Sequence, residues 1–409
     1  MSSPKKLNIL NDPIYGFITI PHSIVFELME HPYFQRLRRI SQMGLSYLVY
    51  PGANHTRFHH ALGATLLMQK AVHLLRFKGV EINAEEEEAL YIAILLHDIG
   101  HGPFSHAMEN SIINGVSHEE ISLLFMEHLN RKFNGKLTLA IDIFRGKYDR
   151  KFLCHLISGQ LDMDRLDYLK RDSFYAGTPE GNINAERLIT MLNVVDDSLV
   201  VEEKGIYSVE KFIIARRFMY WQVYLHKTSI VAEQLLVQIL KRAKFLVHDG
   251  RQLSCSKPLK FFLLNNVTKV SLNEDILEIF AQLDDYDIIS AIKLWKDEDD
   301  FVLANLCDML LNRKLLKIKI KDASFSEEII QKKKENFVKQ YAITEEEAKY
   351  FVFTGVISNQ AYSDTKQKIN LLTGKGKVIN ISEASEQLNS IALTKWVTKF
   401  YLCYPKPKD

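Results

Sequence analysis

Histidine is concentrated in one short part of the chain. Of the 14 histidines, eight lie between residues 55 and 118: His55, His59, His60, His73, His97, His101, His106 and His118. Imidazole is a metal ligand when neutral and titrates near neutral pH, so histidines grouped near carboxylates suit a metal site or acid–base chemistry. The remaining histidines, such as His128 and His155, are better explained as packing or surface residues.

The sharpest motif in this window is the doublet His97-Asp98, followed by Gly100, His101 and Gly102. The doublet offers a neutral nitrogen and an anionic oxygen from adjacent positions. Adjacent helical residues point about 100° apart, so both side chains can be neighbouring ligands of one ion. A His-Asp doublet alone is usually an ordinary helix-end pair, so further ligands are required.

Two more ligands are expected from elsewhere in the chain. His60 lies upstream, and Asp164 lies in a segment that also carries Asp162 and Asp167. Either of these neighbours could serve in place of Asp164. Two nitrogens and two carboxylate oxygens without sulfur favour a divalent Mn, Fe, Mg or Zn ion in an open or octahedral site.

The elements that must position these residues are helical by their apolar spacing. Helices are predicted over 61–77, with His60 just before it, over 84–99 and over 150–172. The run Glu85 to Glu88 suits the positive end of a helix dipole, and the apolar residues that follow indicate a buried helix. Gly100 and Pro103 stop it just after the doublet.

The whole chain is predicted to be mainly α, with a helical core over 1–250 and a smaller helical and α+β lobe over 251–409. That lobe is a candidate for oligomerisation or regulation. Residues 1–20 are expected to hold a short hairpin. Further helices are predicted over 118–132, 185–194, 208–248, 274–312, 327–341 and 345–348, and strands over 314–321, 350–356, 368–381 and 396–404. Lys375 and Lys377 stand in a predicted hairpin turn rather than a phosphate loop.

The composition indicates an ordinary water-soluble chain. The formal net charge is +2, which gives no electrostatic case for nucleic acid. No stretch approaches the roughly 20 apolar residues of a membrane span. The four cysteines are widely spaced, which argues against disulfides and thiolate zinc sites. We therefore expect a cytoplasmic protein without a membrane partner.

These strings resemble the HD phosphohydrolase superfamily, whose signature is His…His-Asp…Asp. Within it they look most like the SAM- and HD-domain-containing deoxynucleotide triphosphohydrolases and their bacterial relatives, without the sterile-alpha-motif domain. The shared strings cover residues 8–250 and are Asn11-Asp12-Pro13-Ile14, Phe34-Gln35-Arg36-Leu37-Arg38, Pro51 to His55, Arg57-Phe58-x-His60, His97 to His106, Ser117-His118-Glu119 and Asp162 to Asp172.

The resemblance implies hydrolysis of a deoxynucleoside triphosphate to a deoxynucleoside and inorganic triphosphate. Carried over by position, the metal ligands are His60, His97, Asp98 and Asp164. His118 with Glu119 would transfer a proton to the leaving oxygen, and His101 and His106 would contact the α-phosphate and the attacking water. The phosphates would be held by Arg57, Arg165, Tyr168 and Arg216, with further Mg on the phosphates. The sugar 3′ hydroxyl would be read by Gln42, Tyr168 and Asp172, while Tyr224 would exclude ribonucleotides.

The resemblance also implies a homo-oligomer, either a dimer or a tetramer, with a nucleotide activator. At the implied activator site Arg38 is retained, but Asn8 replaces an expected lysine and Glu30 stands at the guanine-reading position. Met43 and Tyr220 replace the leucine and histidine of the vertebrate enzyme near the nucleotide pocket, which bears on base preference.

Two alternative functions stay open at this point. The first is an HD phosphohydrolase acting on another nucleotide, a monophosphate or a cyclic nucleotide. The second is a nucleotide-sensing protein that keeps the site but turns over slowly.

Overall fold

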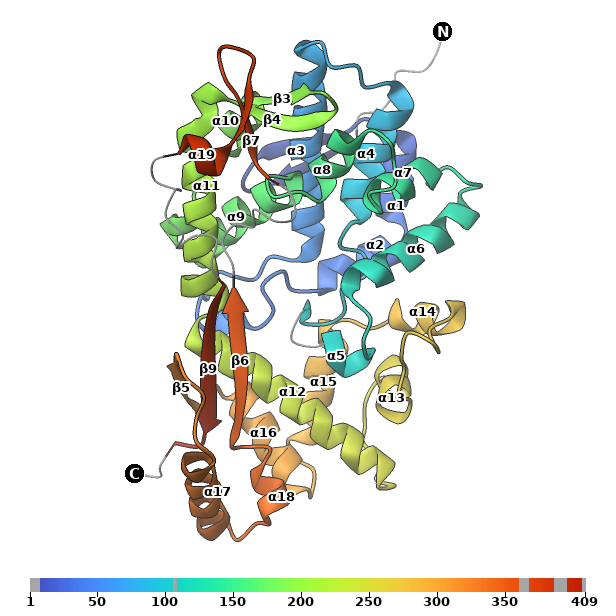
Figure 1. The fold of residues 1–409 in the computed structure, drawn as a ribbon. Coiled ribbons are helices and arrows are strands. Elements are labelled where there is room, and N and C mark those ends of the chain that lie inside the picture. The colour runs from blue at the N-terminus through green and yellow to red at the C-terminus, as the bar shows by residue number, and fades with distance from the viewer. Residues whose placement is uncertain (1–7, 106–108, 360–367, 386–395, 407–409) are drawn as a thin grey trace.

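The computed structural model describes residues 8–105, 109–359, 368–385 and 396–406. The molecule is elongated and mainly helical, as predicted, with the histidine-rich helices in one half and most of the C-terminal elements in the other (Figure 1). Helix α12 (Lys227–His248) crosses the second half. Of the helices in these ranges, none combines the length and apolar character of a membrane span.

The first half opens with the predicted hairpin, β1 (Asn8–Asp12) and β2 (Gly16–Ile20). The elements that follow it, up to α12, are α1 (Ser23–Glu30), α2 (Pro32–Gln35), η1 (Arg36–Arg39), η2 (Ser46–Leu48), α3 (Arg57–Phe77), α4 (Ala84–Leu96), α5 (Glu109–Ile112), α6 (His118–Lys132), α7 (Thr138–Phe144), α8 (Lys151–Ile157), α9 (Met163–Ala176), η4 (Pro179–Gly181), α10 (Ala185–Thr190), β3 (Leu192–Val195), β4 (Ser198–Glu202), η5 (Glu203–Gly205), α11 (Ile206–Phe218) and η6 (Met219–Tyr224).

The elements after α12 mix helices with strands, as expected for the last third of the chain. They are α13 (Lys257–Leu264), α14 (Glu274–Phe280), α15 (Asp285–Trp295), α16 (Phe301–Leu311), β5 (Lys317–Lys321), α17 (Glu327–Tyr341), α18 (Glu345–Ala348), β6 (Phe353–Asn359), β7 (Asn370–Leu372), β8 (Val378–Asn380), α19 (Ile381–Ala384) and β9 (Val397–Tyr404).

Helix α4 is built as its sequence predicts, but it is shorter at its C-terminus. The Asn83 side chain accepts a hydrogen bond from the Glu86 amide, and Glu86 reaches back to the Asn83 amide, which closes a capping box. Residues 89–96 are all buried. The helix ends at Leu96, so His97 and Asp98 lie in the turn that follows, not inside the helix.

Other predicted helices also have different boundaries in the structure: the helix predicted over 185–194 ends at Thr190, and the one predicted over 274–312 is divided into α14, α15 and α16. Helix α3 begins at Arg57, so His60 lies in its first turn and not before it. The predicted helix 150–172 is broken at 158–162, where the Asp162 side chain caps α9 by accepting from the Arg165 amide. The predicted helix 208–248 is interrupted by the π-helical segment η6 and a cap at His226.

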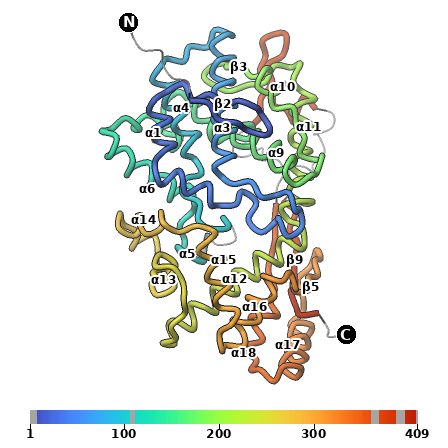
Figure 2. Tube along the Cα trace, turned by 180° about the vertical axis from the view of Figure 1, so that it is seen from behind, coloured from blue at the N-terminus to red at the C-terminus, as the bar shows by residue number. Residues whose placement is uncertain are grey.

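The strands form sheets that the sequence predicted only in part. The strands β7 and β8 form the expected hairpin, but β7 also pairs in parallel with β4, where Val201 faces Leu371. The β3–β4 hairpin was not predicted. The remaining strands form a sheet in the order β5-β9-β6. In Figure 1 the β7 strand lies beside the helices of the first half, away from β5 and β9 in space although β7 and β9 are close in the sequence. Figure 2 shows the two halves from behind.

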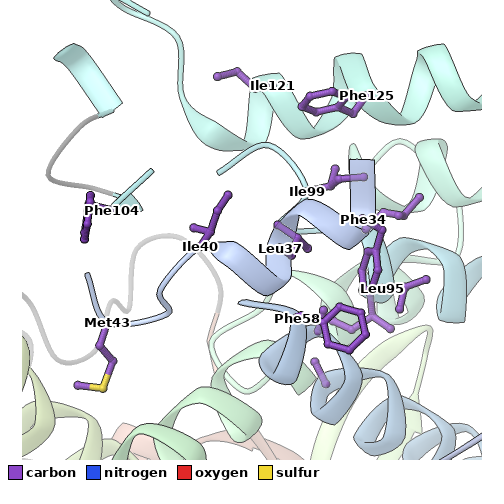
Figure 3. Close-up of a cluster of buried hydrophobic side chains, with 14 of the residues drawn as sticks. Phe34, Leu37, Ile40, Met43, Phe58, Leu95, Ile99, Phe104, Ile121 and Phe125 are labelled. Atoms are coloured by element: carbon purple, nitrogen blue, oxygen red, sulfur yellow. The ribbon is translucent and has the colours of Figure 1, made fainter. Parts of the chain in front are cut away.

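A single large hydrophobic cluster runs through both halves of the molecule. Part of it lies directly behind the histidine-rich turn, where Phe34 and Leu37 meet Leu95 and Ile99 from the end of α4 (Figure 3). All four side chains are fully buried. Close packing of this kind fixes the turn that carries His97 and Asp98.

Candidate active site

The side chains of His60 and His97 meet between α3 and the end of α4. Their Nε2 atoms are 3.2 Å apart, and both rings are buried. The sequence places these residues 37 positions apart, and contacts between α3 and α4 bring them together.

The two predicted carboxylate ligands join the same cluster. Asp164 Oδ1 lies 3.1 Å from His60 Nε2 and 3.5 Å from His97 Nε2. Asp98 Oδ1 lies 3.4 Å from His97 Nε2, and its Oδ2 is 3.8 Å from His60 Nε2. Two ligands at right angles on one ion lie about 3 Å apart, because metal–ligand bonds measure about 2.0–2.2 Å. The spacing of His60, His97 and Asp164 fits a common divalent ion, whereas Asp98 approaches the two histidines with different oxygens and is grouped with His101 and His118.

The hydrogen bonds behind the two rings support this assignment. His60 Nδ1 donates to Asp167 Oδ2 at 2.7 Å, and His97 Nδ1 donates to the Ile94 carbonyl at 2.6 Å. In the neutral rings both Nε2 atoms then carry lone pairs. Two ring nitrogens and a carboxylate oxygen that converge within 3.5 Å need a positive charge among them, either a proton on a ring or a metal ion.

The electrostatics of the cluster also favour a cation. Burial lowers the pKa of His60, but hydrogen bonds to Asp164 and Asp167 outweigh it and raise that pKa to about 10. The pKa of His97 is raised as well, against burial, chiefly by Asp98. The pKa values of Asp98 and Asp164 lie below their usual range, because the neighbouring histidines outweigh burial. A field that attracts protons this strongly also attracts a metal ion.

Asp167, which the sequence left open as a ligand, lies behind His60. Its Oδ2 also accepts from Arg171 Nε at 2.8 Å, and Arg171 NH1 donates to Asp12 at 2.8 Å. Asp167 and Arg171 are fully buried. A Cβ at Gly63 would lie only 2.0 Å from Asp167 Oδ1, so only glycine leaves room for this network.

The second alternative ligand, Asp162, points away from the cluster. Its carboxylate caps α9 and accepts from the Gly159 amide and from Arg165. Burial raises its pKa to about 6. Asp162 is therefore a structural residue that holds Arg165.

A second group of residues lies on the other side of Asp98. His101 Nε2 is 3.3 Å from Asp98 Oδ1, and the rings of His101 and His118 stack at 3.9 Å. His118 Nε2 lies 3.3 Å from Glu119 Oε1, the contact expected for this pair. Asp98, His101 and His118 are close enough to share a cation of their own. His106 lies outside the described residues.

Both groups open onto one pocket of about 450 Å³, which we call the central pocket. A volume of this size accommodates a small organic ligand such as a nucleotide. Its lining residues are Gln42, Met43, Gly44, Ser46, Arg57, Asp98, His101, Phe104, Ser105, His118, Asp164, Arg165, Tyr168, Asp172, Tyr220, Tyr224, Leu225 and Glu233.

Two of the three predicted phosphate-binding arginines line this pocket. Arg57 donates to Asp98 and, through Nε at 2.8 Å, to Ser105 Oγ. Arg165 donates to Asp162 and, at 2.5 Å, to the Gly159 carbonyl. Arg216 does not line it. Its guanidinium lies 5.9 Å from the ring centre of Tyr220, which itself lines the pocket.

The predicted sugar-binding residues lie together on one wall. Asp172 accepts a hydrogen bond from Tyr224 at 2.6 Å, and its other oxygen lies 2.7 Å from His55 Nε2. The Tyr168 ring packs edge-on against Tyr224. Gln42 Oε1 is buried without a hydrogen-bond partner in the described chain, so it is free to accept from a bound hydroxyl. Glu119, by contrast, is largely exposed and does not line the pocket.

Residues beyond 250 support the pocket wall. Asp285, at the start of α15, accepts from the amides of Ser41 at 2.8 Å and Phe104 at 2.7 Å. Phe104 and Ser105 both have φ near +50°, a conformation that costs free energy outside glycine. The buried Asp285, whose pKa burial raises to about 6, therefore helps to hold a strained loop at the pocket.

Known families match the region that holds the site. An HD domain matches residues 57–177 and an HD associated region matches residues 183–249. A Bacillus subtilis protein, YwfO, is 32% identical over 97% of this chain and 92% of its own length.

The chain belongs to the HD phosphohydrolase superfamily.

Two further relatives bear on its chemistry. The crystal structure of a phosphohydrolase from Bacteroides thetaiotaomicron matches this HD protein with a TM-score of 0.95 and 50% identity, covering 98% of this chain and 100% of the other. Human deoxynucleoside triphosphate triphosphohydrolase SAMHD1 is 28% identical over 58% of this chain and 45% of its own length. The HD protein is thus a member of a family of hydrolases.

Sequence reasoning missed several residues that build this site. His55, Ser105 and Asp285 orient lining residues, and Glu233 lines the pocket itself. His55 stood in the histidine-rich window and at the end of the shared string Pro51 to His55, but neither signal assigned it a role. Glu233 and Asp285 carried no signal, because nothing in a helical pattern tells which carboxylate faces a pocket formed by distant segments.

Proposed function

We propose that the protein hydrolyses deoxynucleoside triphosphates to deoxynucleosides and inorganic triphosphate. The observation that carries the proposal is the continuity of the central pocket, which joins two of the predicted metal ligands, Asp98 and Asp164, to Arg57 and Arg165 and to the wall formed by Asp172 and Tyr224. A triphosphate carries several negative charges and needs cations around it, whereas a deoxyribose needs a few polar contacts.

The ion held by His60, His97, Asp98 and Asp164 would supply Lewis acidity toward a phosphate oxygen and a water molecule. We assign Mn, Fe, Mg or Zn to this position, and further Mg to the substrate phosphates. Arg57 and Arg165 would bind the phosphate oxygens, while Arg216 would act from its position beside Tyr220.

In the proposed reaction, water attacks the α-phosphorus and the bond from phosphorus to O5′ breaks. His101, beside Asp98, would orient the water and the α-phosphate together with His106. His118 would give a proton to the departing O5′, and Glu119 would orient its ring. The water oxygen then ends on the inorganic triphosphate.

On the sugar side, Gln42, Tyr168 and Asp172 would bind the 3′ hydroxyl. Tyr224 is held by its hydrogen bond to Asp172, so its ring would occupy the space that a 2′ hydroxyl requires. This arrangement supports a deoxyribose in preference to a ribose.

The test is product analysis on purified protein with Mn and a panel of nucleotides in ¹⁸O-labelled water. Release of labelled inorganic triphosphate from a deoxynucleoside triphosphate is expected. Release of orthophosphate from monophosphates, or of a nucleoside monophosphate from cyclic nucleotides, would replace this proposal with the first alternative. Tight nucleotide binding without turnover would favour a sensor. Asp98→Ala should abolish turnover, whereas Asp299→Asn, at an exposed position, should not.

The proposed assembly is a homo-oligomer, a dimer or a tetramer, and a nucleotide activator is proposed with it. Light scattering with and without added nucleotides, combined with rate measurements, tests both parts. A monomer whose rate does not respond to any added nucleotide would reject them.

A further inference from the structure

One carboxyl group in the central pocket has no role in the proposed reaction. Glu233 stands on α12 and lines the pocket with Met43, Gly44 and Leu225. A Cβ placed on Gly44 would lie 3.5 Å from Glu233 Oε1, so the carboxyl lies directly over the backbone at residue 44.

The carboxyl of Glu233 is unpartnered in the described part of the chain, where it makes neither a hydrogen bond nor an ion pair. The other acidic residues of the pocket, Asp98, Asp164 and Asp172, each contact at least one cationic or hydrogen-bonding side chain. Burial raises the pKa of Glu233 to about 7. Glu233 is only half-buried, so its unpartnered carboxyl stays open to the pocket and can meet a ligand bound there.

The electrostatic surroundings of Glu233 differ from those of the metal cluster. Its pKa responds to burial and to no charged neighbour, whereas those of Asp98 and Asp164 are set by nearby histidines. Neither Arg57 nor Arg165 pairs with Glu233, since these two cations donate to Asp98 and Asp162.

The surroundings of Glu233 suit a flat, apolar group. Met43 and Phe104 line the same pocket and are almost wholly buried. Figure 3 shows both on one side of the core, apart from Phe34 and Phe58. Tyr220 completes this wall. Aromatic and thioether side chains pack well against a heteroaromatic ring.

We propose that Glu233 selects the base of the bound nucleotide by accepting a hydrogen bond from an exocyclic amino group. The inference rests on the proposed function, since it places a nucleotide in the central pocket. Guanine fits best, because its N1–H and N2–H₂ groups can donate to both oxygens in parallel. Adenine and cytosine offer one amino group beside a ring acceptor, which a protonated carboxyl can satisfy. Thymine has no amino group and presents two carbonyl oxygens.

The experiment measures dissociation constants for non-hydrolysable α,β-imido analogues of dGTP, dITP, dATP, dCTP and dTTP in the presence of Mn. The dITP analogue differs from that of dGTP only by the missing amino group, so it tests the contact without altering the protein. Wild-type protein should bind the dGTP analogue about tenfold more tightly than those of dITP and dTTP, as one charge-assisted hydrogen bond predicts.

The variants Glu233→Gln and Glu233→Ala should reduce both ratios to near one. Glu27→Gln, at an exposed position of α1, is the matched control and should keep the wild-type ratios. Equal affinity of wild-type protein for the dGTP and dITP analogues, or unchanged ratios in both Glu233 variants, would overturn the proposal.

Product analysis on the same preparations separates the two proposals. Base selection that depends on Glu233, without triphosphate release, would retain the role of Glu233 and reject the hydrolysis proposed above. Triphosphate release without base selection would support the proposed hydrolysis and reject the role of Glu233. Failure of all five analogues to bind would reject both.

Discussion

The Asp167 carboxylate accepts a hydrogen bond from His60 Nδ1 at 2.7 Å, on the side of the ring opposite the Nε2 atom that faces His97 and Asp164. A carboxylate in this position fixes the tautomer of a metal-binding histidine and increases its basicity. Asp164 and Asp167 are three residues apart on α9, yet they have different roles.

This difference predicts two graded effects on metal binding. Asp167→Asn should weaken the affinity for Mn by about 10–100-fold, the usual effect of removing a carboxylate behind a histidine ligand. Asp164→Ala should abolish stoichiometric binding. Calorimetric titration of chelator-treated protein measures both, with Asp299→Asn as the control. Equal and complete loss in the two variants would make Asp167 a direct ligand.

Removal of the metal should destabilise the fold. Four electron-rich groups converge between α3, α4 and α9, and a cation that binds only the folded chain adds about 2.7 kcal/mol when its free concentration is 100 times the dissociation constant. Thermal unfolding with and without EDTA should show a lower Tm after chelation, reversed by Mn. Asp164→Ala should not respond to either reagent; a similar response in that variant would place the stabilising ion elsewhere.

The Tyr224 ring should control the choice of sugar. Tyr224→Ala opens the space beside Asp172, so the kcat/KM for a ribonucleotide should rise at least about tenfold relative to the matching deoxynucleotide, since a steric clash of roughly 1.4 kcal/mol is removed. Tyr224→Phe keeps the ring and should keep the preference. Parallel steady-state assays with dGTP and GTP provide the measurement. If both variants lose the preference alike, the hydroxyl and not the ring excludes ribose.

A buried ion pair far from the pocket should make stability depend on pH. Glu86 is buried, and it accepts from Arg150 NH1 and from the Tyr148 hydroxyl at 2.8 Å. These contacts outweigh burial and lower the pKa of Glu86 below its ordinary 4.5. The stabilisation is therefore fully present above pH 4.5 and is lost as the pH falls through the lower value of the folded state.

Glu86→Gln should accordingly lower the free energy of unfolding by about 2 kcal/mol at pH 7. The difference from the wild type should shrink as the pH falls below 4.5. Urea unfolding at a series of pH values measures it, and Glu85→Gln, at the exposed neighbouring position, is the control. A difference that is constant from pH 7 to pH 3 would show that the charge of Glu86 does not stabilise the fold.

The sequence was sufficient to predict that His60, His97, Asp98 and Asp164 lie close together, because the His97-Asp98 turn follows from local signals. A capped helix that is buried from Ala89 to its last residue, Leu96, must place His97 and Asp98 at its end. The spacing of residues in the sequence could not by itself decide between Asp164 and Asp167 as the ligand. Both lie on one helix, and the decision depends on Arg171 and Asp12, which bind Asp167 from outside the helix.

The boundaries that were wrong also depend on non-local contacts. The break at 158–162 is the exception, because Gly159 and the helix cap Asp162 are local signals that the predicted helix 150–172 did not take into account. The strand β7 pairs with β4 although Val201 and Leu371 are far apart in the chain. Periodicity describes which face of an element is buried, not which distant element buries it.

The pairing of β7 with β4 also has a consequence for biosynthesis. Because the ribosome makes the chain from its N-terminus, the half that carries the histidine cluster cannot complete its sheet until residue 372 has been translated. A nascent chain shorter than this leaves the outer edge of β4 open to association with other molecules. We therefore expect this half to complete its fold late in translation.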